Sequence, residues 1–346
     1  MSDAPDLFSQ QRSNRRKSAW LVAGFVLVVA WIGFGGDWAL HLATSGGEEG
    51  AYRHVVPWLG LGLTALAAGF AGYAWRSGAA QVLRATGAWE IVEPATPRER
   101  QYLNVVEEMA IAAGLPRPRA CVVPDPDLNA FATGRDPASA AIAVTQGALD
   151  TLTRDELQGV VAHELAHVRN YDVRLMTLLA AMIGAVALFS DFLARTIGRG
   201  GIRTGGRGAG RRGDAKGGGA LVLVVFALWV VTLIVAPVVT RLIAMGVSRK
   251  REFLADATAA QLTRNPAALA SALEKIDASA AATKAIPQGT AHLCIVDPGE
   301  RALAAREGVV GDLFASHPPI RVRIARLRAM AYQQLKASGT APPATT

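Results

Sequence analysis

Cysteine is nearly absent from this sequence, with two residues among 346. Cys121 and Cys294 lie far apart and form no Cys-x-x-Cys pair, so their spacing implies no disulfide framework. We therefore predict that both thiols are buried as small apolar side chains.

Patterns typical of nucleic-acid-binding proteins are missing as well. The net charge of +8 and an isoelectric point near 9.9 would suggest nucleic acid as a partner of a soluble protein. However, the sequence has no RNP, helix-turn-helix or zinc-finger pattern, and its Gly- and Arg-rich stretch 198–219 lacks aromatic residues that could stack on bases. The arginines instead flank long apolar runs, which is typical of a membrane orientation signal. We expect no nucleic-acid partner.

The apolar content is too high for an ordinary soluble protein, with 51% hydrophobic residues and a mean hydropathy of +0.25. A polar, basic N-terminus at 1–17 precedes an apolar run that begins at Ser18 and is long enough to span a bilayer. It is too long for a signal peptide and has no clean small-x-small cleavage site. A second run covers 55–75. We predict a two-helix membrane anchor over 18–76, with the N-terminus in the cytosol.

Two further apolar stretches, 175–194 and 220–245, bring the number of hydrophobic segments to about four. They would form a hairpin over 173–246 around the Gly- and Arg-rich loop. If both stretches span the membrane, that basic loop is translocated against the positive-inside tendency. Two arrangements therefore stay open, a full crossing or a hairpin that does not cross fully.

Residues 77–172 have the composition of a soluble domain. Thr96 and Pro97 are typical of a helix start, and Gly114 is typical of a helix end. Short strands are predicted at 120–123, 129–134 and 140–145. The sequence thus predicts a mostly α-helical membrane protein with a small β-sheet.

Histidine is scarce too, yet two of the six histidines stand at metal-ligand spacing. His163 and His167 belong to His-Glu-x-x-His, and residues four apart share one helix face. Both imidazoles can therefore bind one zinc ion. Zinc lowers the pKa of its bound water to about 7, and Glu164 can accept the proton as attack begins. This is the chemistry of peptide-bond hydrolysis by a metalloprotease.

The segment that carries this motif has a proper helix start. Thr153 at the N-cap and Glu156 three residues later form a capping box. This signal argues against a chance pair of histidines on a solvated face. A small sheet followed by such a helix is a zincin-like arrangement, and we expect the helix to run on past His167.

A catalytic zinc needs a third protein ligand, and no histidine stands at the downstream metzincin position. Glu252 is the best candidate, because the hairpin at 173–246 returns the chain to the membrane face where His167 lies. Asp256, one turn later, can accept a hydrogen bond from a ligand histidine and fix its tautomer. Asp256 is also the next candidate for the third ligand.

Taken together, four motifs resemble those of the HtpX-like membrane metalloendopeptidases, a family that shares its clan with the CaaX-prenyl proteases. The resemblance covers about 95–329 and rests on His163-Glu-x-x-His167, Glu252-x-x-x-Asp256, Asn129-Ala-Phe-Ala-Thr-Gly134 and His317-Pro-Pro. It implies a gluzincin-type protease domain at the membrane face. It also implies one zinc per chain, held by His163, His167 and Glu252, with Glu164 as catalytic base.

The resemblance also suggests residues that contact the substrate. Asn129, Ala130, Phe131, Ala132 and Thr133 can form an edge strand that pairs with an extended polypeptide, or a buried structural strand. His317 can donate to the oxyanion as the carbonyl is attacked, with help from Arg323, or it can cap the C-terminal helix.

The function implied by the resemblance is quality control of membrane proteins. The polypeptide substrates would be misfolded or damaged, the bilayer would be a partner, and the active site would face the cytosol from a bacterial inner membrane. The protease domain would continue over 247–336, followed by a disordered tail at 337–346. The alternatives are a dedicated processing protease of the CaaX-prenyl type and a membrane scaffold with structural zinc. A His-His-Glu set is unusual for structural zinc, which usually has four Cys or His ligands.

Overall fold

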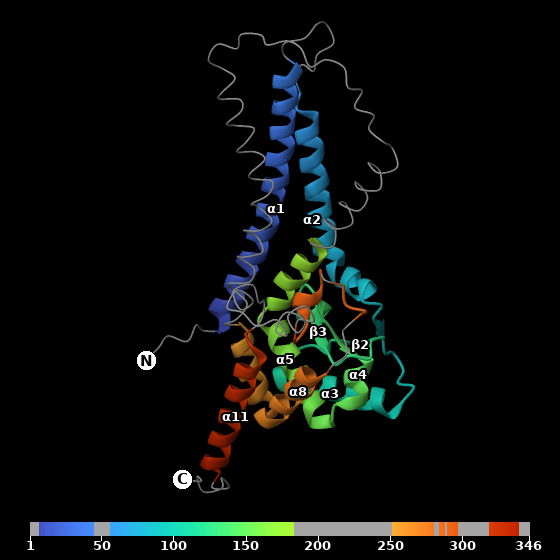
Figure 1. Ribbon diagram of the computed structural model, residues 1–346, viewed down its shortest axis with the longest axis vertical. Helices are drawn as coiled ribbons and strands as arrows, with labels where there is room; N and C mark the ends of the chain where they lie inside the picture. Colours follow the sequence, from blue (N-terminus) through green and yellow to red (C-terminus); the bar gives the residue numbers. More distant parts are fainter. Residues whose placement is uncertain are drawn as a thin grey trace. The chain divides into compact units, whose positions relative to one another are not determined.

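The structure, a computed structural model, describes residues 7–44, 56–182, 251–279, 284–287, 289–296 and 318–338. Two compact units divide the chain. We call one the hairpin unit; its described part consists mainly of 19–44 and 56–73. The other, the sheet unit, contains 7–18, 74–181 and the described residues from 251 onward. Figure 1 shows the elements of both units along the chain.

The hairpin unit contains most of α1 (Leu7–Thr44) and the first part of α2 (Trp58–Ala85). Each helix holds a stretch long and apolar enough to cross a membrane, Gln11–Trp38 in α1 and the whole of α2. Their large apolar side chains are mostly exposed, with 71% of Trp58 accessible. A core helix would bury such side chains, so these two helices agree with the two predicted spans.

The two helices approach closely at a pair of glycines. A Cβ atom added to Gly33 would lie 2.8 Å from the Cα of Gly60. Asp37, which is buried, accepts hydrogen bonds from the backbone N–H of Gly60 (2.6 Å) and Leu59 (3.3 Å). The carboxylate thus caps the N-terminus of α2, where the helix dipole favours a negative charge.

A four-stranded sheet with the order β1-β2-β4-β3 is the centre of the sheet unit. Its central pair is parallel, and both outer strands pair antiparallel. The strands are β1 (Trp89–Glu90), β2 (Arg119–Val123), β3 (Ala130–Thr133) and β4 (Ala141–Thr145). The three predicted strands are confirmed, whereas β1 is too short to give a pattern in the sequence.

Both faces of the sheet are buried. On one face, alternate residues such as Val122 and Ile142 pack with helices α3, α5 and α8; on the other, residues such as Val123 and Phe131 pack with the end of α2 and with helical residues 172–182. This explains why the strands read as continuous apolar runs. The helices on the first face are α3 (Pro97–Ala113), α5 (Arg154–Arg169) and α8 (Pro266–Ala278).

The predicted helix starts are confirmed at atomic detail. The hydroxyls of Thr96 and Thr153 accept the N–H groups of Glu99 and Glu156, whose carboxylates accept the N-cap N–H groups in return. The side chain of Asn265 caps α8 in the same way. The short elements are η1 (Pro137–Ser139), α4 (Gln146–Thr151) and η2 (Ala291–Leu293).

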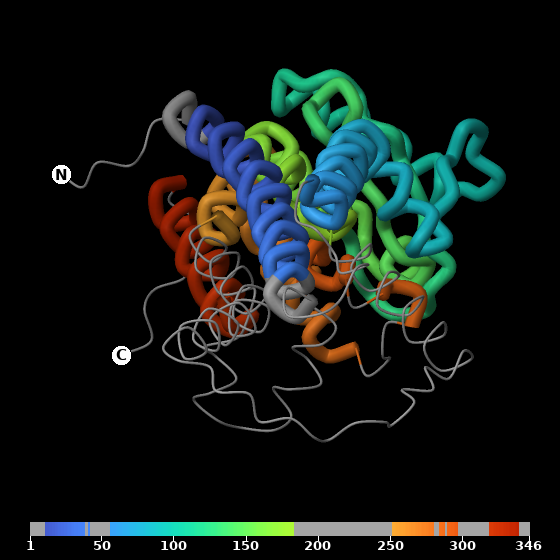
Figure 2. Tube along the Cα trace, turned by 90° about the horizontal axis from the view of Figure 1, so that it is seen from above, coloured from blue at the N-terminus to red at the C-terminus, as the bar shows by residue number. Residues whose placement is uncertain are grey.

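The predicted C-terminal helix is also confirmed, as α11 (Ile320–Ala337). Figures 1 and 2 show it beside α8, and its buried residue Leu327 joins the core that lies under α8. The predicted continuation of α5 is wrong. The helix ends at Arg169, Tyr171 adopts a φ of 59°, and a new helix begins at Asp172. A right-handed helix cannot include that left-handed residue.

Some predicted features lie outside the described residues. They are the loop 198–219, the fourth apolar stretch, the end of the third after Met182, His317 and the tail from 339. Cys121 and Cys294 are buried in the apolar core and form no disulfide, as expected.

Candidate active site

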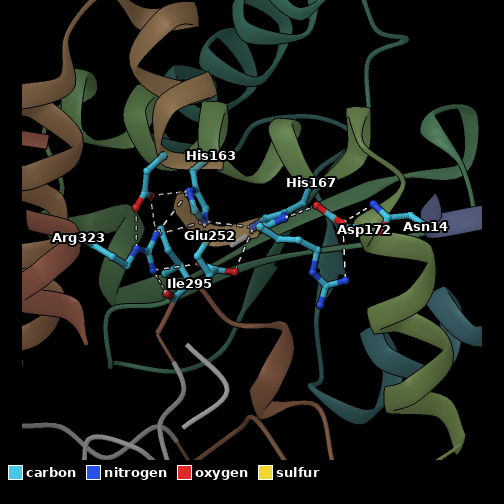
Figure 3. A network of polar contacts seen from close by, with 9 residues as sticks. Asn14, His163, His167, Asp172, Glu252, Ile295 and Arg323 are labelled. Atoms are coloured by element: carbon cyan, nitrogen blue, oxygen red, sulfur yellow. Dashed lines mark hydrogen bonds and ion pairs between the residues drawn. The ribbon is translucent and has the colours of Figure 1, made fainter. Parts of the chain in front are cut away.

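Helix α5 brings two imidazoles together because His163 and His167 are one turn apart. Their Nε2 atoms are 3.3 Å from each other, and both side chains are buried (Figure 3). Glu164, the residue that follows His163, is buried as well. The helix is held between the sheet and α8, and a Cβ atom at Gly159 would lie only 3.0 Å from the Cα of Leu269. Close packing on both sides therefore fixes the histidines.

Glu252 reaches the two histidines from the helical residues 251–263. Its Oε2 lies 3.6 Å from the Nε2 of His163, and its Oε1 lies 3.5 Å from the Nε2 of His167. One ligand atom of each of the three residues lies within 4.8 Å of the others. The structure thus brings Glu252 to the position that the topological argument required.

Asp256 lies one turn after Glu252 and contacts the other nitrogen of His163. The distance from its Oδ1 to Nδ1 is 3.0 Å. Although burial raises the pKa of the Asp256 carboxyl, Arg323 and His163 outweigh it and lower the pKa to about 2. An ionised acceptor beside Nδ1 keeps a hydrogen on that nitrogen, so Nε2 is the nitrogen of His163 that would bind a metal ion.

His167 has an equivalent partner that the sequence reasoning missed. The Oδ2 atom of Asp172 lies 3.3 Å from its Nδ1. The Oδ1 atom accepts a hydrogen bond from Asn14 at 2.6 Å and lies 3.7 Å from Arg251 (Figure 3). In a continuous helix, a residue five positions after His167 would lie about 140° around the axis. Only the break at Tyr171 turns Asp172 back to the histidine.

Arg323 of α11 completes the cluster from the opposite side. Its Nε and Nη2 donate to the two carboxylate oxygens of Asp256 at 2.9 and 2.8 Å, and its Nη1 donates to the carbonyl of Ile295 at 2.8 Å. The same Nη1 lies 3.3 Å from Glu252. Despite full burial, these carboxylates hold the pKa of Arg323 above its usual value. The guanidinium of Arg323 therefore interacts with the carboxylates of Asp256 and Glu252.

Burial acts in opposite directions on the pKa of the ligand candidate His163 and on that of the proposed base Glu164. For His163, burial alone would lower the pKa, but the hydrogen bonds that its imidazole donates to the carboxylates of Asp256 and Glu252 raise it to about 9. For Glu164, burial raises the pKa, and the two histidines and a hydrogen bond from the backbone N–H of Ala132 only reduce that rise. The site thus attracts a cation at the imidazoles and keeps a proton acceptor beside them.

The residues fit a zinc ion by distance and by charge. Two nitrogen ligands of a tetrahedral zinc, each about 2.0–2.1 Å from the metal, lie about 3.3 Å apart, which is the separation of the two Nε2 atoms. Four buried carboxylates lie around the two imidazoles, a donor set and a charge that favour a divalent cation. The carboxylates are Glu164, Asp172, Glu252 and Asp256.

The predicted substrate strand lies next to this centre as β3, at the edge of the sheet. All its side chains are buried, and its outer edge is partly covered by the chain itself. The N–H of Ile295 donates to the carbonyl of Ala130 at 2.8 Å, and Phe131 forms a bridge with Cys294. The side chain of Asn129 donates to the carbonyl of Val296 at 2.9 Å.

Comparison with known proteins decides the family, because residues 97–331, more than half of the chain, match peptidase family M48. The chain belongs to peptidase family M48. The match includes both histidines, Glu164, Glu252 and Arg323.

Curated relatives of this M48 peptidase are described as "Protease HtpX homolog". The protein of Thermoanaerobacter pseudethanolicus is 42% identical over 238 residues, which is 68% of this chain and 74% of that protein. The protein of Streptococcus gordonii is 36% identical over 324 residues, covering 94% of this chain and all of that protein. The resemblance to HtpX-like endopeptidases is therefore confirmed.

A solved structure, that of S. mikatae Ste24p, covers 94% of this chain and 90% of that chain. Its TM-score is 0.40 at 15% sequence identity, a likeness too low to carry an argument. From its family and the two long apolar helices among its described residues, the M48 peptidase is a membrane metalloprotease. Its substrates are polypeptides.

His317, predicted near the oxyanion, lies outside the described residues.

Proposed function

We propose that the protein is a zinc-dependent endopeptidase in which His163, His167 and Glu252 hold one zinc ion. The observation that carries this proposal is the convergence of three ligand atoms beside the buried carboxylate of Glu164. A bound zinc would polarise the scissile carbonyl and make its water a nucleophile near neutral pH. The three-ligand set leaves a coordination position for that water.

The chain's own residues would then transfer protons and orient the ligand histidines. Glu164 accepts a proton from the attacking water and returns it to the leaving amine, a role that suits a carboxyl whose pKa is raised by burial. The N–H of Ala132 holds this carboxylate in place. Asp256 and Asp172 fix the tautomers of the two histidines through Nδ1.

For substrate binding, we propose that an extended polypeptide pairs along β3, from Asn129 to Thr133, and displaces the contacts that 294–296 make with the start of this strand. Main-chain hydrogen bonds give affinity with little sequence preference, which suits a protease that removes damaged proteins. Such a segment would pass Glu164, because Ala132 of the same strand is its hydrogen-bond donor. His317 is proposed as a donor to the oxyanion.

The proposed role is quality control of misfolded or damaged membrane proteins, as the names of the relatives suggest. A dedicated CaaX-type processing protease would need a chamber for a lipidated substrate, and two candidate spans among the described residues give no support for one. A scaffold with structural zinc is disfavoured by the buried Glu164 beside the ligand set.

The function is tested by metal analysis together with casein cleavage. Protein purified with a chelator should lack zinc and activity, and added zinc should restore both. Glu164→Gln should keep one zinc per chain and lose cleavage by about 10²- to 10⁴-fold, because the base is gone while the ligands stay. Asp155→Asn, an exposed change on the same helix, is the matched control. Near-normal cleavage by Glu164→Gln would remove this residue from the mechanism.

The proposed orientation places the active site in the cytosol of a bacterial cell. Arg12, Arg15, Arg16 and Lys17 hold the N-terminus inside, and two spans return Arg76 to that side. Cysteine probes should therefore react from outside at Gly47 but not at Ser338. The reverse labelling pattern would invert the topology and remove cytosolic segments as substrates.

A further inference from the structure

A second charged site lies in the sheet unit, away from the metal ligands. It is a cavity of about 170 Å³ between α2, the start of β2, the turn after β3 and helical residues 172–182. We call it the arginine pocket. None of its lining residues is acidic, and four are arginines: Arg76, Arg119, Arg135 and Arg174.

The positive charge of the arginine pocket is only partly compensated. Arg135 lies 3.0 Å from Asp136, and Arg119 lies 3.7 Å from Glu90, both as ion pairs in contact with solvent. Such exposed pairs have weak net interaction. Arg76 and Arg174 form no ion pair with any acid in the described part of the chain. The pocket therefore favours an anionic ligand.

Arg174 is held in place before any ligand arrives. Its Nε donates to the carbonyl of Arg135 at 2.6 Å, and its guanidinium lies 5.3 Å from the ring centre of Trp75 and 5.1 Å from that of Tyr171. Burial and the nearby Arg15 lower the pKa of Arg174, and Asp136 and Tyr171 offset only part of that shift. Its Nη donors are left for a ligand, and a planar guanidinium suits the bidentate recognition of phosphate.

The position of the pocket along α2 identifies the source of the anion. Trp58 and Trp75 are about 26 Å apart along the helix axis at 1.5 Å per residue. This is close to the hydrocarbon thickness of a bilayer, about 30 Å. Trp75 and the adjacent Arg76 then lie at the level of the lipid headgroups, where tryptophan and arginine are enriched.

We propose that the arginine pocket binds the headgroup phosphate of an anionic membrane lipid. Basic pockets at the cytoplasmic ends of membrane helices are suited to such headgroups. The volume has room for about six water molecules of about 30 Å³ each, enough for a phosphate with a small alcohol substituent. Free phosphate shares this chemistry, whereas an acidic protein segment is a different class of partner.

A bound lipid would also contact the end of the proposed substrate strand. Thr177 lines the pocket, and its Oγ1 accepts the backbone N–H of Gly134 at 3.1 Å and lies 3.0 Å from the hydroxyl of Thr133, the last residue of β3. The lipid would thereby hold this strand end at the membrane surface. The lipid site does not depend on the metal or on catalysis.

The test is a lipid titration of the full-length protein in neutral detergent, with bound lipid measured by native mass spectrometry. Phosphatidylglycerol should bind more tightly than phosphatidylcholine and than inorganic phosphate. Arg76→Gln combined with Arg135→Gln should weaken phosphatidylglycerol by about 25-fold, at about fivefold for each arginine, while phosphatidylcholine is unchanged. Both side chains are exposed, so the fold should persist. Arg328→Gln, which removes an exposed arginine of α11, is the matched control.

The variant Arg174→Lys tests whether the lipid phosphate is bound through the geometry of the guanidinium or through its charge alone. It should lower the affinity for phosphatidylglycerol, because lysine keeps the charge but loses the bidentate geometry. The proposal is wrong if the double variant keeps its lipid preference, or if phosphatidylglycerol and phosphatidylcholine bind equally. It is also wrong in its choice of ligand if inorganic phosphate binds as tightly as phosphatidylglycerol, or if an acidic peptide displaces the lipid at lower concentration.

Discussion

The metal centre and the arginine pocket are two charged clusters of the sheet unit, and their charges are opposite in sign. The metal centre is rich in carboxylates, whereas the pocket is rich in arginines. The metal centre has four buried carboxylates and two arginines, and its donor atoms converge within a few ångströms. The arginine pocket has four arginines and no acid in its lining, and three of these arginines, Arg76, Arg119 and Arg135, are exposed. The first cluster therefore fits a small divalent cation, and the second fits a solvent-accessible anion.

The difference also shows how each cluster is held. At the metal centre, every histidine nitrogen facing away from Glu252 contacts a carboxylate, and Asp256 is itself bound by Arg323. Such a buried network of ion pairs is rigid, because separating the buried charges would be costly. In the arginine pocket Arg174 is held by a backbone carbonyl and two aromatic rings, whereas Arg119 and Arg135 form only solvent-exposed ion pairs. We infer that the metal centre is preorganised, whereas the pocket adapts to its ligand.

The largest effect is expected from loss of the third ligand. Glu252→Ala should abolish both zinc binding and casein cleavage, because two neutral imidazoles alone bind zinc weakly and Arg323 then faces the empty position. Lipid binding should not change. Zinc content by elemental analysis is the measurement, with Glu274→Ala on α8 as the control. Full zinc occupancy in Glu252→Ala would assign the third ligand to another residue, and Asp256 would be the next to test.

An intermediate effect is expected at the two carboxylates behind the histidines. Asp256→Asn and Asp172→Asn should each weaken zinc by about 10- to 100-fold, because the tautomer of one histidine is no longer fixed. Asp256→Asn should also lower the midpoint of thermal unfolding more, because it leaves the buried Arg323 without its ionised partner. Zinc affinity by chelator competition and a thermal scan measure the two effects. Equal unfolding midpoints would contradict the assigned role of Arg323.

The smallest effect is expected from a change in ionic strength, which should alter lipid binding at the arginine pocket but not zinc binding at the metal centre. Raising the ionic strength from about 0.05 to about 0.5 M should weaken phosphatidylglycerol binding several-fold, because exposed charges are screened over about 10 Å or less. The zinc content should stay constant, since the carboxylates and histidines are buried. Both are measured on the same sample. A salt-independent lipid affinity would mean that the pocket binds the lipid through apolar contacts.

Local chemistry in the sequence was sufficient for most of the fold. The helix start at Thr96 and Pro97, the capping box at Thr153, the apolar strand runs and the two spans were predicted because each depends on neighbouring residues. The pair His163 and His167 follows from helix periodicity alone. Glu252 and Asp256 were predicted by combining that periodicity with the return of the chain to one membrane face.

The tertiary structure alone decided the rest of the site. Asp172 became a partner of His167 through a single left-handed residue, Tyr171, and the periodicity of a helix gives no sign of such a break. Arg323 meets Asp256 across 67 positions of sequence, and the arginine pocket gathers side chains from four separate elements. Spacing within a helix follows from covalent geometry, whereas contacts between elements depend on how the whole core packs.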